Sequence, residues 1–174
     1  PVSLMVDLPA DVDIVRLLKA EGKRMLVAAS TGHGLLVPTE AALAQTRSGK
    51  QVLNISGTAR AVACCVAEGD MVASVGMNRK LLVFPIDELP EMTRGKGVIL
   101  QRFKDGGLAD VTVYSAEAGL SWKAGGGRTR TEADMSDWLG KRAGAGKMPP
   151  TGFPRPARFT LSLIHISEPT RQIV

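Results

Sequence analysis

Two short loops combine glycine with adjacent basic side chains. The first basic loop, TRSGKQ at residues 46–51, carries Arg47 and Lys50, and the second basic loop, TRGKG at residues 93–97, carries Arg94 and Lys96. Because glycine has no side chain, the backbone amides beside it can approach a ligand closely, and the neighbouring cations add positive charge. Loops of this kind predict binding of phosphate groups by charge and by amide donors, without dependence on base identity.

Further cations extend this predicted phosphate-binding track through a hairpin turn and a strand exit. The competing interpretation is that they are solvated turn charges, which is the usual state of Lys and Arg. Aromatic residues make up only 4% of the chain and do not alternate with the basic ones, so contact with a duplex backbone is favoured over base stacking. The predicted DNA-binding residues are Arg47, Lys50, Arg94, Lys96, Arg79, Lys80, Arg102 and Lys104.

Other site chemistry has little support in the sequence. The GAGKM stretch around Gly146 lacks the spacing of a nucleotide-binding loop. Cys64, Cys65 and His33 lack a metal-ligand spacing, and no G-x-S-x-G accompanies His33 for nucleophilic catalysis. We therefore predict no catalytic residue and no metal site, with buried strand cysteines and a histidine that faces solvent or DNA.

Acidic side chains cluster just before the second basic loop, at Asp87, Glu88 and Glu91. Paired carboxylates can perform acid-base chemistry. Local charge balance with the basic loop is the simpler interpretation.

Composition indicates a folded globular chain. Of 174 residues, 44% are hydrophobic and 22% charged, which is typical of one domain or two small ones, and no run is long and apolar enough for a membrane span. The net charge of +5 divides into −2 over residues 1–22 and +7 over residues 23–160, which predicts a polyanionic partner for the basic part. The two adjacent cysteines and the absence of an initial Met or a signal pattern predict a cytoplasmic fragment.

The C-terminal residues 161–174 differ in character from the rest of the chain. The stretch LSLIHISEPTR at residues 161–171 resembles the translation of an adapter used to prepare sequencing libraries, so we assign no function to residues 161–174. The alternative is a genuine edge strand, because Leu161, Leu163 and Ile166 alternate with other residues.

The elements that must position the basic loops repeat along the chain. A shift of 46 places residues 25–53 on residues 71–99 without a gap, and eight of the 29 pairs are identical. Each repeat is predicted to be one supersecondary unit of four strands, the size of a propeller blade. The strands are predicted at residues 25–29, 35–37, 51–55 and 61–66 in the first repeat, and at residues 71–75, 81–84, 98–103 and 109–114 in the second.

Turn residues separate the predicted strands. Pro38 and Pro85 end the second strand of each repeat, because proline interrupts strand pairing. A short turn or helical crossing, at residues 39–44 or 86–89, then leads to each basic loop.

The whole chain is predicted to be an all-β, incomplete array of blades. After Trp138 the chain is too rich in Gly, Pro and Arg for regular structure. The predicted units are residues 1–22, the end of a preceding blade (strand Val2–Val6) and a connector; 23–70, a blade; 71–118, a blade; 119–160, a degenerate last blade with an irregular C-terminal segment; and 161–174, the adapter-like tail.

The basic loops occur within longer stretches that resemble one family. PIDELPEMTRGKGVILQRFKDGGLADV at residues 85–111 and GLSWKAGGGRTRTEADMSDWLGKRAGAGKMPPTGFPR at residues 119–155 resemble the C-terminal domains of type IIA topoisomerase A subunits, within the topoisomerase IV branch. The resemblance covers nearly all of residues 1–160. It implies a β-pinwheel, whose four-stranded blades exchange a strand with their neighbours and bend duplex DNA around a basic rim.

The resemblance also implies a role within a larger enzyme. The chain would orient duplex DNA for ATP-dependent strand passage by a catalytic core outside it, in a bacterial heterotetramer of two A and two B subunits, located in the cytoplasm at the nucleoid. ATP and Mg²⁺ would act in other regions, with no cofactor in this one. Tyr114, the single tyrosine, lies outside the arginine-tyrosine context of family nucleophiles, so the fragment is not expected to cleave DNA.

Two alternatives remain open. Gyrase A subunits carry a complete QRRGGKG box, whereas only partial versions occur here, which favours the topoisomerase IV branch over a gyrase wrapping domain. The second alternative is a propeller-like scaffold whose basic rim meets an acidic protein.

Overall fold

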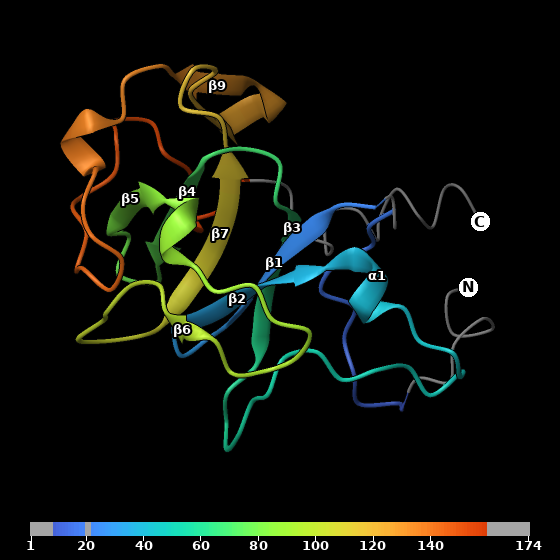
Figure 1. The fold of residues 1–174 in the computed structure, drawn as a ribbon. Helices are drawn as coiled ribbons and strands as arrows, with labels where there is room; N and C mark the ends of the chain where they lie inside the picture. Colours follow the sequence, from blue (N-terminus) through green and yellow to red (C-terminus); the bar gives the residue numbers. More distant parts are fainter. Residues whose placement is uncertain (1–8, 20–21, 160–174) are drawn as a thin grey trace.

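The regular structure of the chain is almost entirely β (Figure 1). The computed structural model describes residues 9–19 and 22–159; the predicted strand Val2–Val6 and the tail at 161–174 lie outside these residues. The strands are β1 (Arg24–Ala29), β2 (His33–Pro38), β3 (Ala61–Val66), β4 (Met71–Gly76), β5 (Leu81–Pro85), β6 (Val98–Ile99), β7 (Leu108–Tyr114), β8 (Leu120–Lys123) and β9 (Thr129–Glu132). Short helical turns are α1 (Thr39–Ala42), η2 (Ile86–Glu88), η3 (Gly125–Gly127) and η4 (Ser136–Trp138).

The strands form three antiparallel sheets, which confirms the all-β prediction. The first sheet has the order β3-β1-β2-β6, the second β5-β4-β7, and the third is the β8-β9 hairpin. In the first two sheets a hairpin is followed by a strand that pairs with the hairpin's first strand. The added pairing is irregular at matching places, at Ala28/Ala29 on β1 and at Val75/Gly76 on β4. The sequence repeat thus has a structural counterpart.

Proline ends the second strand of both hairpins, as predicted. Strands β2 and β5 finish at Pro38 and Pro85, which also lie at the N-terminal ends of α1 and η2. The fixed φ of proline suits the start of a helical turn, and its missing N–H cannot continue a ladder. The predicted helical crossings toward the basic loops are therefore confirmed.

Neighbouring units exchange a strand. Although β6 follows β5 in sequence, it pairs with β2 of the first sheet, with His33 opposite Ile99 and Gly34 opposite Val98. The second sheet is completed in a related way, because Leu81 bridges Lys147 and Val83 bridges Leu139. This exchange is the β-pinwheel arrangement.

Two predicted strands are shorter in the structure than the sequence indicated. Residues 51–55 form one isolated bridge, Leu53 with Gly95, instead of a strand. The strand predicted at 98–103 ends at Ile99, and the side chain of Gln101 beyond it is buried. There Gln101 accepts a hydrogen bond from Ser74 Oγ and donates to the carbonyls of Lys80 and Ala145.

The main apolar core lies between the first two sheets. It joins Leu26 and Leu36 of the first sheet to Val72 and Phe84 of the second, all at most 1% exposed. A second cluster joins the second sheet to the C-terminal part of the chain, where Trp122, Phe153 and Phe159 are buried. Residues 139–159 contain no helix or strand, as predicted, yet the aromatic side chains of Phe153 and Phe159 complete this core.

Gly97 allows the exchanged strand to approach β2. It adopts φ +78°, and a Cβ atom there would lie 2.0 Å from the carbonyl oxygen of Gly34. We expect Gly97→Ala to lower the free energy of unfolding by more than about 1 kcal/mol, since both the backbone and the contact are strained. Gly49→Ala is the matched control, because Gly49 has φ +81° but open space around it. Equal losses in urea unfolding of the two variants would contradict a role for the close contact.

The carboxylate of Asp110 anchors the C-terminal segment to β7. Its Oδ2 accepts a hydrogen bond from the Phe159 amide at 2.9 Å, and its Oδ1 accepts one from the Val111 amide at 2.9 Å. Arg158 beside it donates to the carbonyl of Ala109. Burial raises the pKa of Asp110 above its ordinary 3.8, although these amides and Arg158 act in the opposite direction.

This raised pKa predicts a pH dependence of stability. The folded state holds the Asp110 proton more tightly than the unfolded state, so the contribution of Asp110 is greatest below pH 3.8 and declines as the pH rises through the folded pKa. Relative to Asp110→Asn, the wild-type chain should therefore be more stable at about pH 4 than at about pH 7. Urea unfolding of both chains across this range measures the difference, and parallel pH profiles would contradict the assignment.

Candidate nucleic-acid interface

Backbone hydrogen bonds join the segment that follows the first basic loop to the second basic loop. The chain leaving the first loop runs beside the second, where the Asn54 amide donates to the Gly95 carbonyl at 2.8 Å and the Gly95 amide donates to the Val52 carbonyl at 3.0 Å. Lys50 precedes Val52 by two residues, at most about 7 Å of extended chain. The strand exchange carries the second loop to the edge of β2 (Figure 1). The fold therefore places the segment that leaves the first loop beside the second loop, which is distant from it in sequence.

The four cations of these loops face solvent without acidic partners. Arg47, Lys50, Arg94 and Lys96 are all exposed. No acidic side chain in the described parts of the chain forms an ion pair with any of them. Exposed cations that are not neutralised by carboxylates retain their charge for an external anion.

The acidic residues before the second loop have other contacts. Glu91 pairs with Arg24 of β1 at 3.3 Å, and Glu88 accepts a hydrogen bond from the Arg142 amide. The expected charge balance with Arg94 is therefore wrong for these two carboxylates. They hold neighbouring chain segments together and leave the cations of the loop available.

The amides of Gly49 and Gly95 donate hydrogen bonds within the protein. The Gly49 amide donates to the Thr46 carbonyl at 3.2 Å, and that of Gly95 donates to Val52. The expectation that these amides approach a phosphate is thus wrong for the two glycines. The exposed side-chain cations of the loops remain available to an anion.

His33 lies at the start of β2, next to the second loop. Its Nδ1 is 3.0 Å from Thr31 Oγ1, and burial together with the charge of Lys96 lowers its pKa below the ordinary 6.5. A neutral imidazole adds no repulsion to the cations beside it. His33 is therefore a polar neighbour of the basic region at neutral pH.

The remaining predicted residues lie around the β4-β5 turn. This turn contacts the loop after β6, because the Met77 amide donates to the Gly107 carbonyl. Arg79 is half-buried, and its guanidinium donates to the carbonyls of Pro154 and Phe153, so it anchors the C-terminal segment. Lys80 is half-buried, whereas Arg102 and Lys104 are exposed.

Two residues of the candidate interface, Arg60 and Asn54, were not predicted from the sequence. Arg60 is exposed and exchanges hydrogen bonds with Ser30, whose carbonyl also accepts from the Leu108 amide. Asn54 accepts a hydrogen bond from Arg94 Nε through its side-chain oxygen at 3.3 Å. Neither carries a local sequence signal, because the significance of both comes from contacts with distant residues.

The cysteines and the tyrosine occupy structural positions. Burial raises the pKa of Cys64 to about 11 and that of Cys65 to about 12, so both are protonated thiols at neutral pH. Burial, with a smaller effect of Asp70, raises the pKa of Tyr114 to about 12. The described residues contain no group of three or more His, Cys, Asp or Glu side chains that could hold a metal ion.

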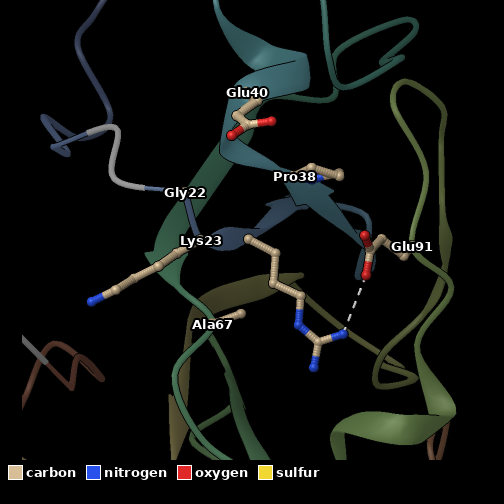
Figure 2. Close-up of a pocket in the computed structure, with 7 residues that line it drawn as sticks. Gly22, Lys23, Pro38, Glu40, Ala67 and Glu91 are labelled. Carbon is tan, nitrogen blue, oxygen red and sulfur yellow. Dashed lines mark hydrogen bonds and ion pairs between the residues drawn. The ribbon is translucent and has the colours of Figure 1, made fainter.

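A hollow of about 390 Å³ lies at the opposite end of the first hairpin from His33. Figure 2 shows Glu40 and Glu91 on its walls, with a dashed line marking the ion pair between Glu91 and Arg24. Lys23, at its rim, pairs with Glu68. Because charges of both signs line this hollow, it is a poorer match for a polyanion than the basic loops.

The curated relatives that match most of the chain are A subunits of DNA topoisomerase 4. No protein-family model matches the chain. The DNA topoisomerase 4 A subunit of Caulobacter vibrioides is 45% identical over 160 residues, and that of Rickettsia bellii is 43% identical over 160 residues. These alignments cover 91% of the chain but only 21% and 22% of the relatives, so the chain spans about a fifth of their length.

Solved structures agree on the fold. The Escherichia coli ParC C-terminal domain superposes with a TM-score of 0.71 at 21% identity, covering 87% of this chain and 66% of that one. A DNA gyrase A C-terminal domain is a weaker match, with a TM-score of 0.62 at 12% identity, covering 90% of this chain and 55% of that one. No helix in the described residues is long and apolar enough to cross a membrane. Over the matched residues, the chain belongs to the family of DNA topoisomerase IV A subunits and has the β-pinwheel fold of their C-terminal domain.

Proposed function

We propose that this chain binds the phosphate backbone of duplex DNA through Arg47, Lys50, Arg94 and Lys96. The observation that carries the proposal is the pairing of Val52 and Asn54, which follow the first basic loop, with Gly95 of the second, together with the exposure of the four loop cations and their lack of described acidic partners. Arg102 and Lys104, also exposed, are a secondary contact region beside the β4-β5 turn. Contacts of this type are independent of base sequence, which suits an enzyme acting on DNA crossings of any sequence.

Within a full enzyme, the chain would hold and orient duplex segments. The relatives' identity as topoisomerase IV A subunits supports this role. Strand passage, ATP hydrolysis and the use of Mg²⁺ would take place in other parts of a heterotetramer of A and B subunits, in the cytoplasm at the nucleoid. The chain itself would contribute binding and no bond cleavage.

Binding to a short duplex of random sequence tests the proposal. We expect affinity at low salt that falls steeply between about 50 and 200 mM salt, because neutralised phosphates release counterions. Fluorescence anisotropy with a labelled duplex measures both quantities. Undetectable binding at low salt would contradict the proposal and leave the protein-interaction scaffold as the better explanation.

A further inference from the structure

We propose that Asn54 is a positioning residue for DNA binding, holding the guanidinium of Arg94 toward the phosphate backbone. This inference rests on the proposed function and adds a residue that contacts no phosphate itself. Asn54 belongs to the chain leaving the first basic loop, whereas Arg94 belongs to the second. The positioning contact therefore joins the segment after the first basic loop to the second basic loop.

The backbone of Asn54 is attached to the same loop that carries Arg94. Its amide donates to the Gly95 carbonyl at 2.8 Å, and the Gly95 amide donates to the Val52 carbonyl at 3.0 Å. These two bonds enclose Leu53, which forms a bridge with Gly95. The Cα of Asn54 is thus held at a defined place beside Arg94.

The side-chain contact uses the one guanidinium nitrogen that lies on the stem of Arg94. Asn54 Oδ1 accepts from Arg94 Nε at 3.3 Å, and the described residues provide Arg94 with no other hydrogen bond or ion pair. The two terminal nitrogens keep their four N–H donors for an external acceptor. A phosphate can accept two parallel hydrogen bonds from such a fork.

Orientation before binding reduces the entropy lost on binding. A free arginine side chain must be immobilised when it contacts phosphate, and a contact that already orients it removes part of this cost. Arg47 in the first loop has no hydrogen bond to another described residue that would orient it. Arg94 should therefore contribute more to DNA affinity than Arg47.

A double-mutant cycle on the 174-residue chain tests this assignment. Duplex affinity is measured by fluorescence anisotropy for wild type, Asn54→Ala, Arg94→Ala and the double variant. We expect Asn54→Ala to weaken binding by about threefold to tenfold, the effect of freeing one arginine side chain. In the Arg94→Ala background the same change should have no further effect. Ser56→Ala is the matched control, since Ser56 is exposed in the same segment and its side chain forms no hydrogen bond to Arg94.

A second variant separates orientation from folding. Arg94→Lys keeps the positive charge but has no Nε–H donor for Asn54, so it should bind DNA more weakly than wild type and be insensitive to Asn54→Ala. Additive losses for Asn54→Ala and Arg94→Ala, or wild-type affinity of Asn54→Ala, would overturn the positioning role. Absence of any effect of Arg94→Ala would instead contradict the proposed DNA contact itself.

Discussion

Replacement of Arg47, Lys50, Arg94 and Lys96 together by alanine is expected to remove most of the chain's affinity for duplex DNA. Each phosphate contact contributes about 0.9 to the slope of log affinity against log salt concentration. Four contacts contribute about 3.6, which corresponds to an approximately 150-fold change in affinity between about 50 and 200 mM salt. The slope of log affinity against log salt concentration should therefore be smaller by about 3.6 in the variant. Anisotropy titrations at several salt concentrations, with duplexes of unrelated sequence, measure the slope.

The control for this prediction is a variant that loses four positive charges at other positions in the chain. Arg128, Lys141, Lys147 and Arg155 are exposed, lie outside both basic loops, and make no ion pair with a described acidic residue. Their replacement by alanine should reduce the salt slope by much less than the loop variant does. Equal reductions in the two variants would show that overall charge, not the two loops, accounts for binding.

Phe153→Ala is expected to destabilise the fold by about 3 to 5 kcal/mol, the usual cost of removing a buried phenyl ring. Phe153 is 5% exposed, and its ring centroid lies 5.4 Å from that of Trp122 and 5.5 Å from that of Phe159. Its carbonyl also accepts a hydrogen bond from Arg79. Loss of the ring leaves a cavity between two aromatic neighbours that the irregular backbone cannot fill. Urea unfolding followed by tryptophan fluorescence measures the change, since Trp122 lies beside the cavity.

A side chain in the same segment provides the control for Phe153. Met148 is 60% exposed, and its carbonyl, which is retained in every variant, accepts the hydrogen bond from Trp138 Nε1. Met148→Ala should alter stability by no more than about 0.5 kcal/mol. If Phe153→Ala unfolds at the same urea concentration as Met148→Ala, the C-terminal segment is not part of the core.

The local elements of the fold could be predicted from the sequence, because they depend on interactions between neighbouring residues. The hairpins at β1-β2 and β4-β5 follow from short apolar runs, intervening turns, and Pro38 and Pro85 at their ends. These signals act between residues close in sequence, so they can be recognised without knowledge of any tertiary contact. The strand predicted at 51–55 failed because its hydrogen bonds depend on a distant partner, and the structure supplies only Gly95.

In the candidate site too, some features could be predicted from the sequence and others depend on the tertiary structure. Residue types and the 46-residue repeat indicated which cations could hold phosphate, and all four loop cations are exposed. The repeat could not show that Asn54 contacts Arg94, 40 residues away, or that Arg79 donates to Pro154, 75 residues away. Similar charges in similar turns thus have different roles, which depend on the segments that pack beside them.

Composition and short-range patterning were sufficient to predict a β-rich repeating chain with cationic turns, because alternation, turn residues and charge act locally. Tertiary packing decided which segments lie side by side, through the exchange of β6 into the first sheet, and it engaged Arg79 and the amides of Gly49 and Gly95 in hydrogen bonds within the protein. It also buried Phe153 in a Gly- and Pro-rich segment that has no periodicity. These outcomes depend on the shape and hydrogen-bonding needs of distant surfaces, which local sequence patterns do not specify.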